Sequence, residues 1–84
     1  MYVEFLGIPR ERAGINELEI EARTLGDVLD TLTARFPQFR DLIDDGHLHP
    51  SIAANLNCDV FVSDRQTPLA KDDRLLILSA DAGG

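Results

Sequence analysis

The sequence predicts an α+β domain in which a single β-sheet is covered mainly by one helix. Two segments near its start alternate apolar and polar residues, as half-buried strands do. Apolar residues then recur at intervals of three and four over residues 24–36, the spacing of one helical face. Further short apolar runs follow. Strand patterns on both sides of one principal helix are typical of α+β domains with one sheet.

The first two strands are predicted at residues 1–6 and 16–22. Alternation in the first strand turns Val3 and Phe5 towards the core. Residues 7–14 lie between the strands and contain proline and glycine, so the sequence predicts a connection there. The two strands are therefore predicted to form a hairpin.

The principal helix is predicted to start at Thr24, whose side chain can cap the first turn, and to end at Pro37. Residues 38–46 are predicted to add a short helical turn that returns Phe39, Leu42 and Ile43 to the core. The remaining strands are expected at residues 51–56, 59–62 and 75–78.

The last strand is unusual because it is apolar on both faces. If Leu75 and Ile77 face the core, Leu76 and Leu78 face outward. Three residues of other strands are predicted to share the outward direction: Leu6, Val60 and Val62. Exposed apolar patches on small proteins often mark a partner surface. A central strand buried on both faces would give the same pattern, and the sequence leaves both interpretations open.

The charge balance argues against one large class of function. Eight Lys and Arg residues stand against 15 Asp and Glu residues, giving a net charge of −7 without a basic cluster. Nucleic-acid binding depends on cations that neutralise phosphates, so it is not expected. No run approaches the ~20 apolar residues of a membrane span, and the first residues do not resemble a secretion signal. With Cys58 as the only cysteine, no internal disulfide is possible and a cytoplasmic location is expected.

Few side chains suggest an active site of the protein's own. His47 and His49 could share one face of a strand near two aspartates, but two histidines without a third close ligand make a weak zinc pattern. The alternative is a solvated loop, and no metal site is expected. Cys58 has no predicted base beside it, which favours a structural cysteine. We therefore expect no independent catalytic centre.

The sequence divides into a predicted domain at residues 1–78 and a predicted flexible tail at residues 79–84. The tail has no large apolar side chain, and its last residues are Gly83 and Gly84. A frayed end would account for this composition. Glycines also lack a Cβ atom, so this part of the backbone can adopt angles that are closed to other residues.

Several stretches of the sequence together resemble a known family. They are the Arg10–Glu11 pair with Gly14, the helix TLGDVLDTLTARFP, the strand IAANLN, the segment TPLAKDDRLLIL and the final AGG. In these stretches the chain resembles the sulfur carriers of the ubiquitin-like β-grasp group. The small subunit of molybdopterin synthase is the nearest type, followed by the thiamine-biosynthesis carrier. The departures are a turn without glycine at residues 71–74, Ser79 and Ala80 where prolines are common, and Asp81 at a usually apolar position.

The resemblance implies a mixed sheet of about five strands packed on one main helix plus a short helix. It also implies that the carboxyl group of Gly84 is adenylated and converted to a thiocarboxylate, with Gly83 as its unhindered neighbour. No bound cofactor is expected, because ATP is used by the adenylating partner, an enzyme of the ubiquitin-activating type. A second expected partner is the large subunit of molybdopterin synthase or another sulfur acceptor. The implied partner-binding residues are Leu6, Val62, Leu78, Asp81 and Ala82.

Other roles stay open within the same resemblance. The chain could carry sulfur for thiamine, cysteine or tRNA thiolation. It could instead be a ubiquitin-like modifier that forms isopeptide bonds through Gly84, or a β-grasp interaction module with an inert tail.

Overall fold

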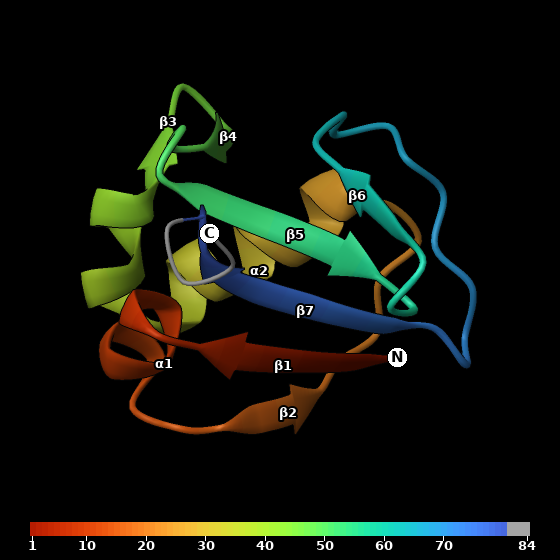
Figure 1. Ribbon diagram of the computed structural model, residues 1–84, viewed down its shortest axis with the longest axis horizontal. Helices are drawn as coiled ribbons and strands as arrows, with labels where there is room; N and C mark the ends of the chain where they lie inside the picture. The colour runs from red at the N-terminus through yellow and green to blue at the C-terminus, as the bar shows by residue number, and fades with distance from the viewer. Residues whose placement is uncertain (81–84) are drawn as a thin grey trace.

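A β-sheet forms the centre of the structure, a computed structural model that describes residues 1–80 and not 81–84 (Figure 1). Within the described residues, five strands make up this sheet in the order β2-β1-β7-β5-β6. Their bounds are Tyr2–Leu6 (β1), Glu17–Glu19 (β2), Ile52–Leu56 (β5), Val60–Val62 (β6) and Arg74–Ser79 (β7). β1 and β7 are parallel and the other neighbouring pairs are antiparallel. The predicted α+β class and mixed sheet are confirmed.

The segment between β1 and β2 is a short helix, α1 (Ile8–Ala13), where the sequence predicted a connection. Pro9 occupies its first turn, where a missing N–H is harmless and the fixed φ suits a helix. Gly14 ends the helix with a left-handed φ of 76°, and its N–H donates to the carbonyl of Arg10 at 2.8 Å. Proline and glycine therefore start and stop a helix here. β1 and β2 pair as the predicted antiparallel hairpin.

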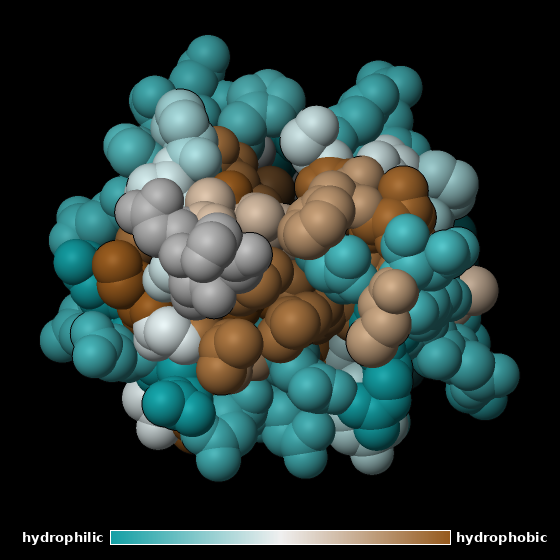
Figure 2. Space-filling model, in the orientation of Figure 1, coloured by the Kyte–Doolittle hydropathy of each residue, from teal (hydrophilic) through white to brown (hydrophobic). Residues whose placement is uncertain are grey.

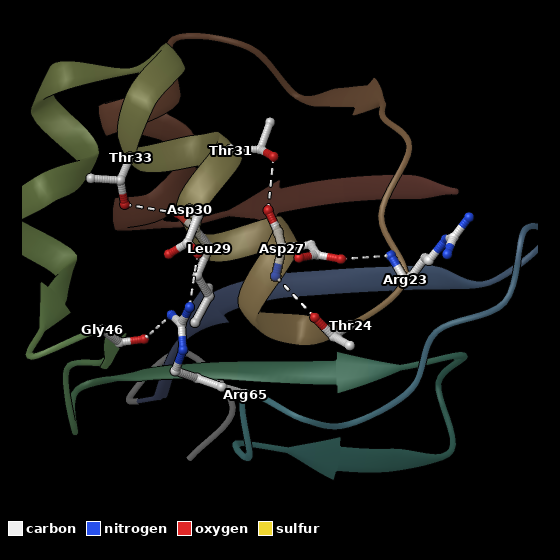
Figure 3. Close-up of polar contacts among 9 residues, drawn as sticks. All are labelled: Arg23, Thr24, Asp27, Leu29, Asp30, Thr31, Thr33, Gly46 and Arg65. Atoms are coloured by element: carbon white, nitrogen blue, oxygen red, sulfur yellow. Dashed lines mark hydrogen bonds and ion pairs between the residues drawn. The ribbon is translucent and has the colours of Figure 1, made fainter.

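The principal helix, α2 (Leu25–Arg35), lies behind the sheet in Figure 1. Thr24 caps it as predicted, because its hydroxyl accepts the N–H of Asp27 at 3.2 Å (Figure 3). The Asp27 carboxylate in turn accepts the N–H of Arg23 at 3.1 Å. The helix ends two residues before Pro37, since the residue preceding a proline disfavours helical geometry.

Arg65, in the loop after β6, ties that loop to two other parts of the fold. Its guanidinium donates to the carboxylate of Asp30 at 2.8 Å and to the carbonyl of Gly46 at 2.7 Å (Figure 3). The hydrogen bond to Asp30 raises the pKa of Arg65, which remains a cation. The Arg65 carbonyl also accepts the N–H of Gly26 at 2.8 Å, which satisfies a donor in the first turn of α2.

After α2 the chain forms a 3₁₀ helix, η1 (Pro37–Leu42), and a short antiparallel ribbon of β3 (Ile43–Asp44) and β4 (His47–Leu48). The predicted helical turn is confirmed. Phe39 is fully buried, and its ring packs edge-on against Phe5 with centroids 5.9 Å apart. η1 thereby closes one end of the core.

The core lies between α2 and the inner face of the sheet. Four inner-face residues of the central strands are buried: Val3, Phe5, Leu75 and Ile77. They belong to one apolar cluster with side chains of α2, which are Leu25, Val28, Leu29 and Leu32. The opposite face of the sheet is turned to the viewer in Figure 1, and no helix of the described residues lies over it. Its side chains can therefore contact solvent or a partner.

Candidate functional site

The face of the sheet opposite α2 is apolar over its central strands. Figure 2 shows this face, with hydrophobic residues gathered across its middle. Leu75 and Ile77 point into the core, and Leu76 and Leu78 alternate with them on the outer side, as predicted. Leu6 is 42% exposed and is paired with Leu78 across the parallel strands.

β6 corrects part of the predicted outer face. Val62 is paired with the buried Ala54 and packs against the core, so it faces inward rather than towards a partner. Val60 lies on the same inner side, opposite Leu56, although it is 49% exposed at the edge of the sheet. Phe61 takes the outward position and is 66% exposed. If the register of a strand is assigned one residue off, every side chain is placed on the wrong face of the sheet, which explains why the predicted orientation of β6 is reversed.

The residues that share this outer side define the outer apolar face: Leu6, Leu76, Leu78 and Phe61. Ala53 of β5 is paired with Leu78 and lies between the leucines and β6. The outward orientation predicted for Leu6 and Leu78 is confirmed. Their contact with a partner protein stays a prediction.

Charged residues border the outer apolar face on the β2 side. Glu17 and Glu19 are exposed on β2, in register with Glu4 and Tyr2 of β1. Glu4 forms an ion pair with Arg74, whose guanidinium also lies over the Tyr2 ring, 4.9 Å from its centroid. Arg74 balances the charge of Glu4, whereas the two glutamates of β2 add net negative charge. This border is therefore acidic.

The end of β7 forms hydrogen bonds with residues next to both of its neighbouring strands, β1 and β5. β7 continues to Ser79, one residue beyond the predicted strand, and the Ser79 hydroxyl accepts the N–H of Ile8 at 3.0 Å. The N–H of Ala80 donates to the carbonyl of Ser51 at 2.7 Å. Four predicted site residues follow in sequence and lie outside the described residues: Asp81, Ala82, Gly83 and Gly84.

The histidines and the cysteine show no comparable arrangement. His49 Nδ1 accepts the N–H of Ser51 at 3.1 Å and lies 2.8 Å from its hydroxyl. Over residues 1–80, no three His, Cys, Asp or Glu side chains gather as a metal site requires. Cys58 is exposed at the turn between β5 and β6. In the same described range, no helix is long and apolar enough to cross a membrane.

Two features of this region were missed by sequence reasoning. The outward position of Phe61 depends on the hairpin turn at Asn57, because this turn sets the register of β6. The turn residues were the part of the sequence from which this register could have been predicted. The contact between Ser79 and Ile8 joins residues 71 apart in sequence, and no local pattern reports such a contact.

Nearly the whole chain matches one protein family. The family model of ThiS matches residues 3–84, a range that includes both terminal glycines. The chain belongs to the ThiS family. The resemblance to ubiquitin-like sulfur carriers is therefore confirmed at the level of the family.

Solved structures share the fold of this ThiS-family chain. The solution structure of small archaeal modifier protein 1 from Methanosarcina acetivorans aligns with a TM-score of 0.80 and 26% identity, covering 99% of this chain and 94% of that one. A chain in the crystal structure of the Amycolatopsis orientalis BexX/CysO complex aligns equally well, with a TM-score of 0.80, 26% identity and coverage of 99% and 98%.

A third structure extends the comparison at lower identity. The putative molybdopterin converting factor subunit 1 from Pyrococcus furiosus has a TM-score of 0.76 and 20% identity over 93% of each chain, which supports the fold alone. Among curated proteins, no sequence matches this chain significantly. The predicted β-grasp, ubiquitin-like fold is confirmed, in a family of sulfur carriers and protein modifiers.

Proposed function

We propose that the protein is a sulfur carrier whose Gly84 carboxyl group is converted to a thiocarboxylate. The observation that carries this proposal is the ThiS-family match, which runs through Gly83 and Gly84. The protein would act as a substrate and sulfur donor for other enzymes. It would not need a catalytic centre of its own.

The chemistry explains why a glycine carboxyl group needs a partner enzyme. A carboxylate is a poor electrophile because its negative charge repels a nucleophile and its resonance makes the carbon less electrophilic. Its oxygen attacks the α-phosphorus of ATP, pyrophosphate leaves, and an acyl adenylate forms. Hydrosulfide then attacks the acyl carbon and AMP leaves, which places sulfur where an oxygen stood. A side chain on Gly84 would crowd this carbon, whereas glycine leaves it open.

The outer apolar face supports the proposal because a carrier must be held while its end reacts. Leu6, Leu78 and Phe61 present apolar surface on the side of the sheet that α2 leaves uncovered. Covering such surface contributes roughly 25 cal/mol per Å² to association, before the entropic costs of binding. The acidic border formed by Glu17 and Glu19 favours a partner with basic residues around its own apolar patch.

Among sulfur-transfer pathways, we assign the chain to molybdenum cofactor synthesis as the small subunit of molybdopterin synthase. The support is the resemblance of the helix, the Pro68–Leu69 segment, the last strand and the terminal glycines. The thiocarboxylated protein should transfer its sulfur to the pterin precursor when mixed with the large subunit of that synthase. Transfer to a thiamine, cysteine or tRNA pathway enzyme instead would reassign the pathway and retain the carrier.

A modifier role is the second candidate, and one comparison favours it. The aligned protein of Methanosarcina acetivorans is described as a small archaeal modifier protein. In that role, the activated Gly84 carbonyl would be attacked by a lysine amine and AMP would leave as an isopeptide bond forms.

Intact mass spectrometry separates these roles. The protein should be incubated with its cognate activating enzyme, ATP and hydrosulfide, with a variant lacking Gly84 as the control. A mass increase equal to one oxygen exchanged for sulfur, absent in the control, is the expected result. Lysine-linked adducts isolated from the native cells would support the modifier. The carrier proposal fails if the wild-type mass does not change.

A further inference from the structure

The last described residues are fastened on both sides of β7. On the β1 side, the Ser79 hydroxyl accepts the N–H of Ile8 at 3.0 Å, where α1 begins near the end of β7 (Figure 1). On the β5 side, the N–H of Ala80 donates to the carbonyl of Ser51 at 2.7 Å. We refer to these two hydrogen bonds as the exit clamp, because they fix the point from which the tail continues.

The exit clamp satisfies a donor that α1 cannot satisfy itself. The first N–H groups of a helix have no partner within the helix. The residue before α1 is Gly7, which has no side chain to cap the helix. Ser79 supplies the missing oxygen from the far end of the sequence. The hydroxyl therefore has a specific backbone partner at the exposed end of β7.

Two properties of Gly7, its backbone angles and its lack of a Cβ atom, allow this contact. Its φ of 71° and ψ of −134° lie in a region that residues with side chains rarely occupy. A Cβ atom on Gly7 would also lie 2.7 Å from the Ser79 hydroxyl oxygen, well inside contact distance. The glycine and the serine thus form a close pair that joins the start of α1 to the end of β7.

We propose that Ser79 is a positioning residue: through the exit clamp it sets where the tail begins and therefore how far the Gly84 carboxyl group reaches into the activating enzyme. This inference rests on the proposed carrier function. Ser79 does not touch the reacting atoms in this proposal. It acts on them through the number of residues that separate the exit clamp from Gly84.

The reach can be worked out from chain geometry. Residues 81–84 span at most roughly 13–14 Å at about 3.3–3.6 Å per residue. Releasing Ser79 and Ala80 would raise the number of residues beyond the last held position from four to six, a span of at most roughly 20–22 Å. Effective concentration falls roughly as the −3/2 power of linker length, so this change alone lowers it about twofold. Misplacement of the carboxyl group by about 1 Å adds a further loss of rate.

The first measurement tests the exit clamp on the isolated protein. Ser79→Ala removes the acceptor, and one hydrogen bond of about 0.5–1.5 kcal/mol corresponds to a change of about 2- to 12-fold in local opening. Hydrogen exchange followed by NMR should therefore be faster by this factor at the Ile8 and Ala80 amides. Ser79→Thr keeps a hydroxyl and should restore wild-type exchange. Unchanged exchange at both amides in Ser79→Ala overturns the proposal.

The second measurement tests positioning, by ATP–pyrophosphate exchange with the cognate activating enzyme. Ser79→Ala removes one of the two hydrogen bonds and retains the bond between Ala80 and Ser51, so the added length should lower kcat by up to about twofold. KM should be unchanged, because the outer apolar face that docks is intact. Ser79→Thr should recover kcat. A variant with faster amide exchange but wild-type kcat would show that the exit clamp is only structural. A raised KM with wild-type kcat would make Ser79 a docking residue, which also overturns the proposal.

An insertion keeps the test decisive if Ser79→Ala does not fold. One glycine placed between Ala80 and Asp81 lengthens the tail and leaves both hydrogen bonds of the exit clamp in place. We expect wild-type amide exchange and wild-type KM with a reduced kcat. Wild-type kcat in this insertion variant would overturn the inference. If the wild-type protein supports no ATP–pyrophosphate exchange and forms no thiocarboxylate, the proposed function itself fails.

Discussion

Replacing Phe61 with serine tests whether the outer apolar face is a docking surface. Phe61 is 66% exposed, so about one third of it is buried in the folded protein. Truncating a fully buried phenylalanine costs roughly 3–5 kcal/mol, which scales to about 1–2 kcal/mol at this position. The variant should therefore remain folded with a modest loss in the free energy of unfolding, measured by urea titration.

The effect of the same change on docking should be larger. The exposed part of Phe61 would be covered by the partner, and truncating an aromatic residue that anchors an interface typically costs about 2 kcal/mol or more. That loss corresponds to a Kd for the activating enzyme raised about 30-fold. Isothermal titration calorimetry at constant salt concentration is the appropriate assay, because the acidic border makes affinity depend on ionic strength.

Val60→Ser is the matched control for this prediction. Val60 lies beside Phe61 on the same strand and is 49% exposed, but its side chain is on the inner side of β6. Its substitution should leave the Kd within about twofold of wild type, since rim and off-interface residues contribute little. Equal losses of affinity in the two variants, or none for Phe61→Ser, would refute the assignment of faces.

Four further substitutions, one of them a control, test other parts of the structure. Leu78→Asp should keep a cooperative thermal transition by circular dichroism while weakening docking, and global unfolding of this variant would place Leu78 in the core. Gly7→Ala should lower the free energy of unfolding by about 1–3 kcal/mol because of its φ of 71° and its closeness to Ser79. Gly14→Ala, also at positive φ but with open space around it, should lose less. Hydrogen bonds from the Ala70 N–H and the Asn57 amide lower the pKa of Asp73. The ionised carboxylate therefore stabilises the folded protein above the ordinary aspartate pKa of about 4, and this contribution is lost as pH falls below that value. Urea titration should therefore show Asp73→Ala to be less stable than wild type at neutral pH, with a difference that shrinks in strong acid; a constant difference would contradict this.

The central strands could be predicted from sequence because their burial is one-sided and regular. In β1 and β7, buried residues such as Val3 and Ile77 alternate with outward ones, and this periodicity is written in the sequence. β6 carries no such information, since it has only three residues and all are apolar. Its register is set by the turn before it, where the N–H of Asp59 donates to the carbonyl of Leu56 at 3.0 Å.

α1 and the exit clamp were beyond local patterns for different reasons. Pro9 and Gly14 break a helix when they lie inside it, yet they favour one when they lie at its two ends, and the residues alone do not distinguish these cases. Ser79 contacts Ile8 only because β1 and β7 are neighbours in the sheet. Such a contact follows from the tertiary arrangement, which must be known first.

The parallel pair of β1 and β7 has a consequence for how the protein is made. The ribosome synthesises β1 first, but its partner at the centre of the sheet is the last of the five strands, with Phe5 opposite Ile77. A nascent chain that stops before residue 74 lacks this central strand and cannot assemble the sheet. The two glycines follow β7 closely in the sequence. Translation order therefore places both glycines on a chain in which all five strands of this sheet have already been synthesised.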